Sequence, residues 1–290
     1  MSGDTEKGRA ALYALLAARV GGEAAAWLVE RGTAPEAVRP AMAEIGRVFG
    51  RKPLVAGFAE RAGTTVEGSC GPLSVGSWRI DEAARTWLLA TAAAATAHPH
   101  AALFEHYDLG DTDTRVAALH AQNLVPDDEA EKGMALVLDA GRTYLDPLLT
   151  AAWCDNPYSA KHLSDAEYRG AVLKALFCNV PIDGFIGLSA RADETLAKSL
   201  HDYADEREAA GRAVPAAVWT VAALHARPGL VARLIGRLEH PLPAERRVAA
   251  EALANARDPR SRTFIEERLA RESDPAVVAA LEAARAAVPS

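Results

Sequence analysis

Abundant alanine and the helical spacing of apolar residues most limit what this chain can fold into. Alanine accounts for 64 of the 290 residues, about 22 %. Helix interiors favour alanine over every other residue, whereas β-sheets disfavour it. Apolar residues recur at helical spacing through most of the chain, and no window shows the sustained alternation of a strand. The sequence therefore predicts an all-α protein.

Glycine, proline and capping residues mark where the expected helices begin and end. Pro40 is expected to kink or interrupt one of them, because proline removes a backbone donor. The stretch 63–77 is polar and rich in glycine, and it is the longest predicted loop. The predicted helices cover residues 5–20, 23–31, 35–49, 81–97, 111–122, 126–140, 164–179 and 193–210.

The last sixty residues are repetitive. Val248-Ala249-Ala250 recurs thirty residues later as Val278-Ala279-Ala280. A helix pair that repeats about every 30 residues is typical of an α-solenoid of HEAT type. We therefore expect an all-α array of HEAT-like antiparallel helix pairs, in which residues 228–290 stack on a helical domain of residues 1–227. An irregular helical bundle is the alternative. The helices expected here cover residues 229–239, 244–256, 260–271 and 275–287.

The charge balance disfavours a dedicated nucleic-acid-binding protein. The chain has 32 Lys and Arg against 39 Asp and Glu, a net charge of −7, whereas such proteins usually carry a basic surface. A protein of the helical-repeat DNA glycosylase type stays as an alternative, and it would need a local basic groove formed by Arg169, Lys174 and Arg207.

The N-terminal sequence, the length of apolar runs and the cysteine spacing indicate the compartment and whether the chain crosses a membrane. The first twenty residues do not have the pattern of a secretory signal. The longest alanine-rich run, 86–97, falls short of the ~20 apolar residues of a membrane span. Cys70, Cys154 and Cys178 are widely spaced, which indicates neither a disulfide framework nor a zinc ribbon. We expect a cytoplasmic protein without a membrane span.

Three cations occupy positions where helical spacing predicts apolar contact. Arg142 follows Leu138 by four residues, and Arg207 follows Tyr203 by four. Lys174 interrupts a run that is otherwise apolar on all sides. Buried charge is costly unless it is paired. The acids available as partners are Asp139, Asp193 and Glu206.

Three interpretations of these cations stay open. They could form salt bridges that tie neighbouring helices together. They could line a polar pocket whose spare positive charge binds a carboxylate or phosphate. They could also be exposed at helix ends.

Metal-binding patterns are present but have simpler explanations. His98, His100 and His106, with Asp108, Asp111 and Asp113, could ligate a transition metal, yet the segment is typical of an exposed connection with capping aspartates. His162, Cys154 and His201 form a second, weaker group. The acids of 127–131 resemble a magnesium–diphosphate cluster, but acids at a helix start also stabilise the helix dipole. We therefore predict no metal and no cofactor. No catalytic motif is present.

Several motifs in the middle of the chain together resemble one known family. They are DAGRT (139–143), NPYSAKHL (156–163), VLKALF (172–177), GLSARAD (187–193) and DYADEREAAGR (202–212), with weaker similarity at AWLVERG (26–32) and WRIDEAARTWLL (78–89). The segment is similar to the EboA family over about residues 26–219. Arg169-Gly170 departs from the family pattern, in which an Asn-Gln pair is expected.

The resemblance implies an all-helical protein of secondary-metabolite biosynthesis and metabolite traffic. We expect a protein without a classical catalytic set that binds a small anionic metabolite or a pathway protein. One alternative is a pathway enzyme that acts on an anionic or prenylated substrate, with Glu206 or Asp139 as acid–base group; another is a pure interaction scaffold. The predicted ligand-binding residues are Asp139, Arg142, Asn156, Lys174, Arg191, Tyr203, Glu206 and Arg207.

Overall fold

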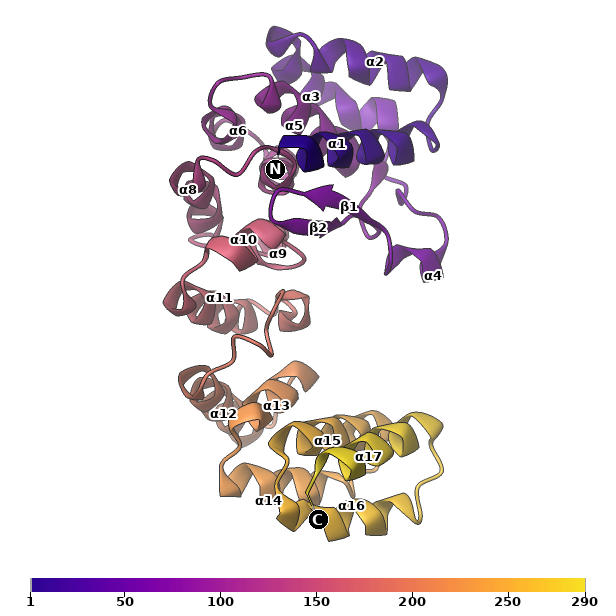
Figure 1. The fold of residues 1–290 in the computed structure, drawn as a ribbon, viewed down its shortest axis with the longest axis vertical. Helices are drawn as coiled ribbons and strands as arrows, with labels where there is room; N and C mark the ends of the chain where they lie inside the picture. Colours follow the sequence, from indigo (N-terminus) through magenta and orange to yellow (C-terminus); the bar gives the residue numbers. More distant parts are fainter. Residues whose placement is uncertain (1, 290) are drawn as a thin grey trace. The chain divides into compact units, whose positions relative to one another are not determined.

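The computed structural model describes residues 2–289, which are mostly helical (Figure 1). The prediction of a mainly helical chain is therefore confirmed. The chain forms two compact units, of which unit 1 ends at Ile186 and unit 2 begins at Gly187. This division lies upstream of the sequence-predicted start of the C-terminal repeats at residue 228.

Unit 1 contains most of the helices and one β-hairpin. Its elements are α1 (Ser2–Ala17), α2 (Gly22–Gly32), α3 (Pro35–Phe49), α4 (Phe58–Arg61), β1 (Thr65–Gly68), β2 (Gly71–Ser74), α5 (Ile80–Ala94), α6 (Pro99–Asp108), α7 (Thr112–Ala121), α8 (Ala130–Ala140), α9 (Asp146–Trp153), α10 (Pro157–His162) and α11 (Asp165–Phe177). Pro40 lies within α3 and does not end it.

The hairpin corrects the prediction of a loop over residues 63–77. β1 and β2 pair antiparallel, with Val66 opposite Leu73, and both of these side chains are buried. Each strand has only four residues, which is too short to give a clear alternating pattern. Helix α1 lies along β1 (Figure 1). This close approach requires Gly8, because a Cβ there would lie 1.8 Å from the Glu67 carbonyl oxygen.

Helix α5 forms the centre of unit 1 and explains much of the alanine content. It packs against α1, α2, α3, α6 and α7. Leu88 and Leu89 are fully buried, as are the alanines at positions 83, 84 and 90. Small side chains let five helices approach one central helix, and large apolar neighbours fill the remaining space.

Three of the predicted helix starts are confirmed by their caps. The side chain of Asp111 accepts from the Thr114 amide at 2.9 Å, and that of Asp193 accepts from the Leu196 amide at 2.8 Å. Ser164 begins α11 with a capping box. The expected helix start at Pro126 is wrong, because α8 begins at Ala130.

Unit 2 consists of helices alone in the part of the chain that the structure describes. They are α12 (Glu194–Ala209), α13 (Ala216–Ala222), α14 (Pro228–Arg237), α15 (Pro243–Ala256), α16 (Arg262–Leu269) and α17 (Pro275–Ala287). Helices α15 and α17 lie side by side (Figure 1). Leu253, Ile265 and Leu281 are fully buried between these last helices.

A buried carboxylate ties the last three helices together. Glu272 accepts two hydrogen bonds from Arg246 of α15, at 2.7 and 2.9 Å, and others from Arg268 of α16. The amides of Ser273 and Asp274, just before α17, also donate to it. These bonds, led by those from Arg246, hold the pKa of Glu272 far below its usual value.

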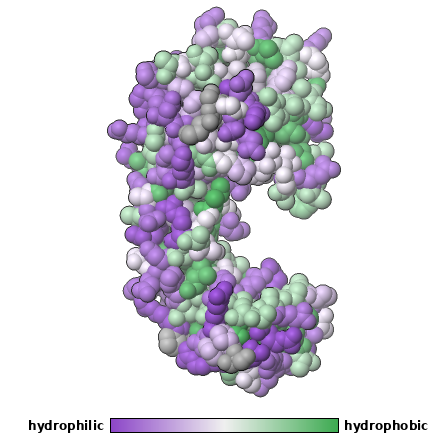
Figure 2. Space-filling view, viewed as in Figure 1, coloured by the Kyte–Doolittle hydropathy of each residue, from purple (hydrophilic) through white to green (hydrophobic). Residues whose placement is uncertain are grey.

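Hydrophilic side chains cover much of the visible face of each unit, with apolar areas between them (Figure 2). Among residues 2–289, none of the helices has both the length and the apolar character needed to cross a bilayer.

Candidate ligand-binding site

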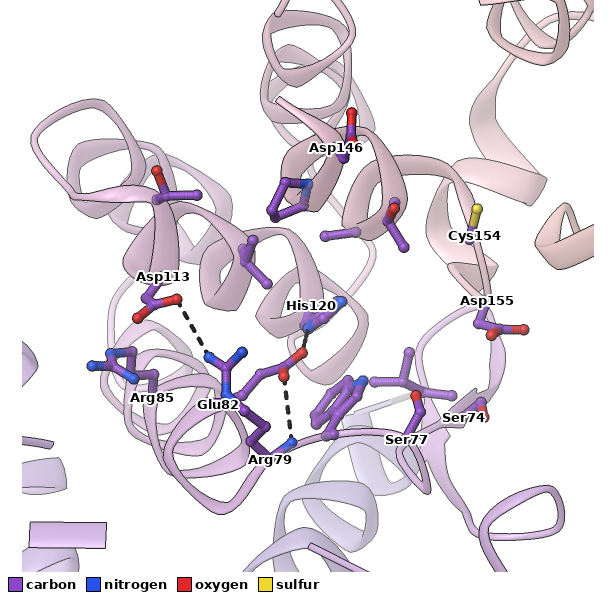
Figure 3. Close-up of a pocket in the computed structure, with 17 residues that line it drawn as sticks. Ser74, Ser77, Arg79, Glu82, Arg85, Asp113, His120, Asp146, Cys154 and Asp155 are labelled. Carbon is purple, nitrogen blue, oxygen red and sulfur yellow. Dashed lines mark hydrogen bonds and ion pairs between the residues drawn. The ribbon is translucent and has the colours of Figure 1, made fainter. Parts of the chain in front are cut away.

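A cavity of about 420 Å³ lies in unit 1 among α5, α7, α9 and the segment that follows β2 (Figure 3). We call it the Glu82–His120 cavity. Its lining includes Trp78, Arg79, Glu82, Asp113 and His120, with Thr150 and Cys154 contributed by α9 and its C-terminal end. Its volume lies within the range of small-molecule pockets.

Local structure at the start of α5 places Glu82 in this cavity. Arg79 is the N-cap residue of α5, and Glu82 is at the third helical position. A carboxylate oxygen of Glu82 accepts from the Arg79 amide at 3.4 Å, so its side chain folds back over the N-terminus of the helix. This is half of the capping-box arrangement, and it follows directly from the WRIDE sequence.

One wall of the cavity is a flat aromatic pair. The rings of Trp78 and His120 are stacked, with centroids 4.5 Å apart and planes 12° apart. Trp78 precedes α5 and His120 lies in the last turn of α7, so tertiary packing brings them together. Both side chains are largely buried.

Glu82 and His120 are neighbours in an environment that disfavours charge. His120 Nδ1 lies 3.5 Å from Glu82 Oε1. Burial raises the pKa of Glu82 and lowers the pKa of His120 to about 3. His120 is therefore neutral at physiological pH. Its Nδ1 is buried, and apart from this long contact with Glu82 it has no hydrogen-bond partner among the residues that the structure describes.

The cations beside this pair are held by acids of their own. Asp81 is fully buried and accepts at 2.9 Å from both Arg79 Nε and Arg85 Nη1. Arg79 also contacts Asp113 Oδ1 at 3.3 Å (Figure 3), and Arg51 donates to the other oxygen of Asp113 at 2.8 Å. This ion-pair network fixes the wall and leaves little uncompensated positive charge.

The cavity does not present an activated nucleophile. Cys154 lines its edge, but burial raises the pKa of this thiol to about 12, so it is protonated at neutral pH. The residues present can stack against a flat group and form hydrogen bonds with it.

Two of the sequence-predicted site residues, Arg142 and Lys174, line one shallower groove. It has a volume of about 290 Å³ and an apolar floor that includes Leu138 and Trp153. We call it the Arg142–Lys174 groove. Lys174 Nζ donates to the Gly141 carbonyl at 2.5 Å and lies 4.6 Å from the ring centroid of Tyr144.

The expectation that Arg142 points into packed surface is wrong, because its side chain is exposed. Helix α8 ends at Ala140, so Arg142 lies beyond the segment in which helical spacing determines direction. Lys174 lies within α11 and is partly buried, and the carbonyl at the end of α8 accepts its hydrogen bond.

The other two predicted residues of unit 1 have partners within the fold. Asp139 accepts from the Tyr107 hydroxyl at 3.0 Å. Asn156 is buried and caps α10, where its side-chain oxygen accepts from the amides of Tyr158 and Ser159. It also accepts from Asn123 Nδ2 at 3.1 Å. These contacts give Asn156 a structural role, and its role in binding a ligand stays a prediction.

The remaining four predicted residues lie in unit 2. Arg191 is partly buried in the segment before α12, and Glu206 is exposed. Tyr203 is buried, and the guanidinium of Arg207 lies 5.8 Å from its ring centroid. Arg207 Nε donates to the Ala213 carbonyl at 2.9 Å. Their role in binding a ligand stays a prediction.

The histidine-rich segment is not a single cluster. His98 Nδ1 contacts Glu129 Oε1 at 2.9 Å, and Asp111 caps α7, as its spacing suggested. Asp127 was expected to act on a helix dipole, but it precedes α8 and binds side chains elsewhere, namely Lys161 and His162.

Sequence reasoning missed the Glu82–His120 cavity, although one signal for it was present. Asp81 and Arg85 stand one turn apart in a helix that is otherwise rich in alanine and leucine, which indicates a buried ion pair. The stacking of Trp78 on His120 has no such signal, because it depends on how α7 packs beside α5.

A family model described as "Metabolite traffic protein EboA" matches residues 9–223. It therefore covers all of the lining residues named above. No curated protein and no solved structure matches the chain.

Proposed function

This chain belongs to the EboA family of metabolite-traffic proteins, and from that premise we propose that it is a non-catalytic carrier. In this proposal it binds a small metabolite of a secondary-metabolite pathway in the Glu82–His120 cavity. It holds the compound between biosynthetic steps rather than transforming it.

The buried imidazole of His120 carries this proposal. Its buried Nδ1 has one long polar contact, 3.5 Å to Glu82 Oε1, and no other hydrogen-bond partner among the described residues; both side chains line the cavity. A buried polar atom that makes no good hydrogen bond costs about 1–3 kcal/mol, and most buried polar groups are satisfied by protein, water or a ligand. A ligand hydroxyl or carbonyl near Glu82 and His120 would offset part of that cost, while its ring could pack on Trp78.

The cavity has little unpaired charge of its own, which favours a ligand with little net charge. Arg79 and Arg85 are already paired with Asp81, and burial favours the neutral forms of Glu82 and His120. The ligand we propose for this cavity is therefore a flat, polar compound.

We place the expected anionic group in the Arg142–Lys174 groove. The exposed guanidinium of Arg142 and the amine of Lys174 lie beside an apolar floor, a combination suited to an acidic group on an apolar body. Helix α9 contributes Thr150 to the cavity and Trp153 to the groove. Two parts of one metabolite, or two different metabolites, could occupy them.

We also propose that α14–α17 form HEAT-like antiparallel pairs. Helix α15 packs against both α14 and α17, and α16 packs against α17. The recurring Val-Ala-Ala sequence does not support the pairing, because Ala249 is buried and Ala279 is exposed. An experimental structure in which one rotation superposes α14–α15 on α16–α17 would establish it.

Native mass spectrometry of the full chain, purified untagged from its own cells, tests the carrier proposal. We expect a species heavier than the polypeptide by a discrete mass that is lost on denaturation. In Thr150→Trp, an indole would fill part of the cavity, and the added mass should disappear. In Thr195→Trp, on an exposed face of α12, it should remain.

Other outcomes separate the alternatives. A polypeptide mass alone, or equal retention by both tryptophan variants, would show that this cavity does not carry a metabolite. Loss of the added mass in Lys174→Gln but not in Thr150→Trp would place the ligand in the groove. Conversion of the bound compound during incubation would support the enzyme alternative.

A further inference from the structure

Three side chains with different metal-binding atoms converge in unit 1, away from both cavities described above. Cys70 lies in the turn between β1 and β2, Asp127 in the segment before α8, and His162 at the end of α10. Their ligand atoms lie within 4.8 Å of one another. We call these residues the Cys70–Asp127–His162 cluster.

The distances within this cluster are close to those of a tetrahedral metal site. Cys70 Sγ lies 3.8 Å from His162 Nε2 and 3.4 Å from Asp127 Oδ2. Ligands bound to zinc at its usual bond lengths are separated by about 3.5 Å. Asp127 Oδ1 lies 2.8 Å from His162 Nε2, so this one contact must lengthen on binding.

The same geometry argues against a catalytic cysteine–histidine–aspartate triad. In a triad, the two ring nitrogens of histidine face different partners, one the nucleophile and the other the acid. Here a single nitrogen, Nε2 of His162, faces both Cys70 and Asp127. Three atoms directed at one point are the arrangement of metal ligands.

The surrounding fold holds these ligands in place. The carboxylate of Asp127 is almost fully buried, and His162 is largely buried, so neither moves freely in solvent. The ring of Tyr158 packs on that of His162, with centroids 4.5 Å apart. The amide of Ser69, next to Cys70, donates to the Asn123 carbonyl at 2.8 Å and fixes the hairpin turn.

We propose that Cys70, Asp127 and His162 bind one divalent transition-metal ion of the zinc type. Thiolate, imidazole and carboxylate form a donor set that zinc accepts, and three protein ligands leave a fourth position for water or another molecule. The ion joins the hairpin turn to the segment before α8 and to α10.

Lys161 competes with this ion. Its amine forms an ion pair with Asp127, while its side chain is about half exposed. A bound dication displaces the amine, which can turn into solvent without disturbing the core.

Metal titration of the untagged full chain, in the presence of a phosphine reductant, tests the proposal. The probes are Zn²⁺ and Co²⁺ alone. We expect one equivalent of either ion per chain, with Co²⁺ giving a near-ultraviolet sulfur-to-metal charge-transfer band. In Cys70→Ser that band should vanish. The affinity for the metal ion should fall by more than about 10- to 100-fold, which is the usual loss when a residue that only hydrogen-bonds to a metal ligand is removed. Cys178→Ser is the matched control and should keep the band.

A second variant distinguishes loss of a metal ligand from misfolding. Lys161→Ala shortens a half-exposed side chain and removes the competing amine, so it should tighten Co²⁺ binding. A gain of about fivefold is expected if the pair is worth as much as a strong surface ion pair. Unfolding cannot mimic such a gain. If the wild-type chain takes up no stoichiometric ion, or if Cys70→Ser keeps the charge-transfer band, the proposed site is wrong.

Discussion

Arg85 lies one helical turn after Asp81, and its Nη1 donates to Asp81 Oδ2 at 2.9 Å inside the core of unit 1. Burial alone would raise the pKa of Asp81, but the hydrogen bonds from Arg79 and Arg85 outweigh it and hold that pKa below its usual value. The pair stands where α5 begins beside the Glu82–His120 cavity.

Removal of Asp81 should destabilise unit 1 strongly. In Asp81→Ala, Arg85 keeps its charge in the core without its carboxylate partner, and breaking a buried pair in this way costs ~3–5 kcal/mol. Asp4→Ala, at an exposed ion pair of α1, should cost about 0–1 kcal/mol. Urea denaturation followed by circular dichroism measures both. Similar small losses in the two variants would contradict a structural role for Asp81.

The stability of unit 1 should fall as the pH falls below about 6.5, because of His120. Its folded pKa is about 3, whereas an unfolded histidine has a pKa near 6.5. The unfolded chain therefore gains a proton in this range while the folded chain does not. The free energy of unfolding therefore keeps its full value with respect to His120 above pH 6.5. Below that pH it declines by up to about 1.4 kcal/mol per pH unit toward pH 3.

Urea midpoints between pH 7 and pH 4 measure this slope. His120→Phe should flatten it, since the ring remains but the titrating nitrogen is gone. His98→Gln should keep most of it, because that side chain is 69 % exposed. An unchanged slope in His120→Phe would show that other groups control acid stability.

Glu82 should make the stability of unit 1 depend on pH in the opposite direction to His120. Burial raises its folded pKa above the unfolded value of 4.5, so its contribution is complete below pH 4.5 and is lost as the pH rises through the folded pKa. Glu82→Gln cannot ionise, and its stability relative to the wild type should therefore increase above pH 4.5. Glu131→Gln, on the exposed side of α8, serves as the control. A difference that does not vary with pH would contradict the raised pKa.

Helical spacing and caps predicted most of the fold, because they depend on neighbouring residues. Asp111, Ser164 and Asp193 cap helices in the structure as they were expected to. The hairpin was missed, since its two short strands gain stability from packing against α1, which local sequence does not report.

The candidate sites were predictable only in part. Spacing identified Arg142 and Lys174, and the structure places both in one groove, although Arg142 is exposed. The convergence of Cys70, Asp127 and His162 could not be predicted. It depends on the missed hairpin turn and on a helix start four residues later than expected, and neither residue type nor spacing indicates that these segments meet.

Replacement by alanine should change the stability in opposite directions at two helical glycines. At Gly133, in α8, a Cβ would lie 2.0 Å from the Tyr158 hydroxyl oxygen and 2.7 Å from His100 Cδ2, in a region without space to adjust. Gly133→Ala should therefore destabilise unit 1 by ~1–3 kcal/mol, as overpacking does. At Gly170, an exposed position inside α11, a Cβ would have no neighbour within 4 Å. Gly170→Ala should stabilise the chain by about 0.5–1 kcal/mol, because alanine has the higher helix propensity.

Thermal unfolding of the two variants beside the wild type measures both effects at once. We expect the midpoint of Gly133→Ala to fall and that of Gly170→Ala to rise. A gain in Gly170→Ala would show that glycine at this position lowers the stability of α11. A loss in Gly170→Ala would contradict this expectation, because no atom lies close enough to clash with the added Cβ.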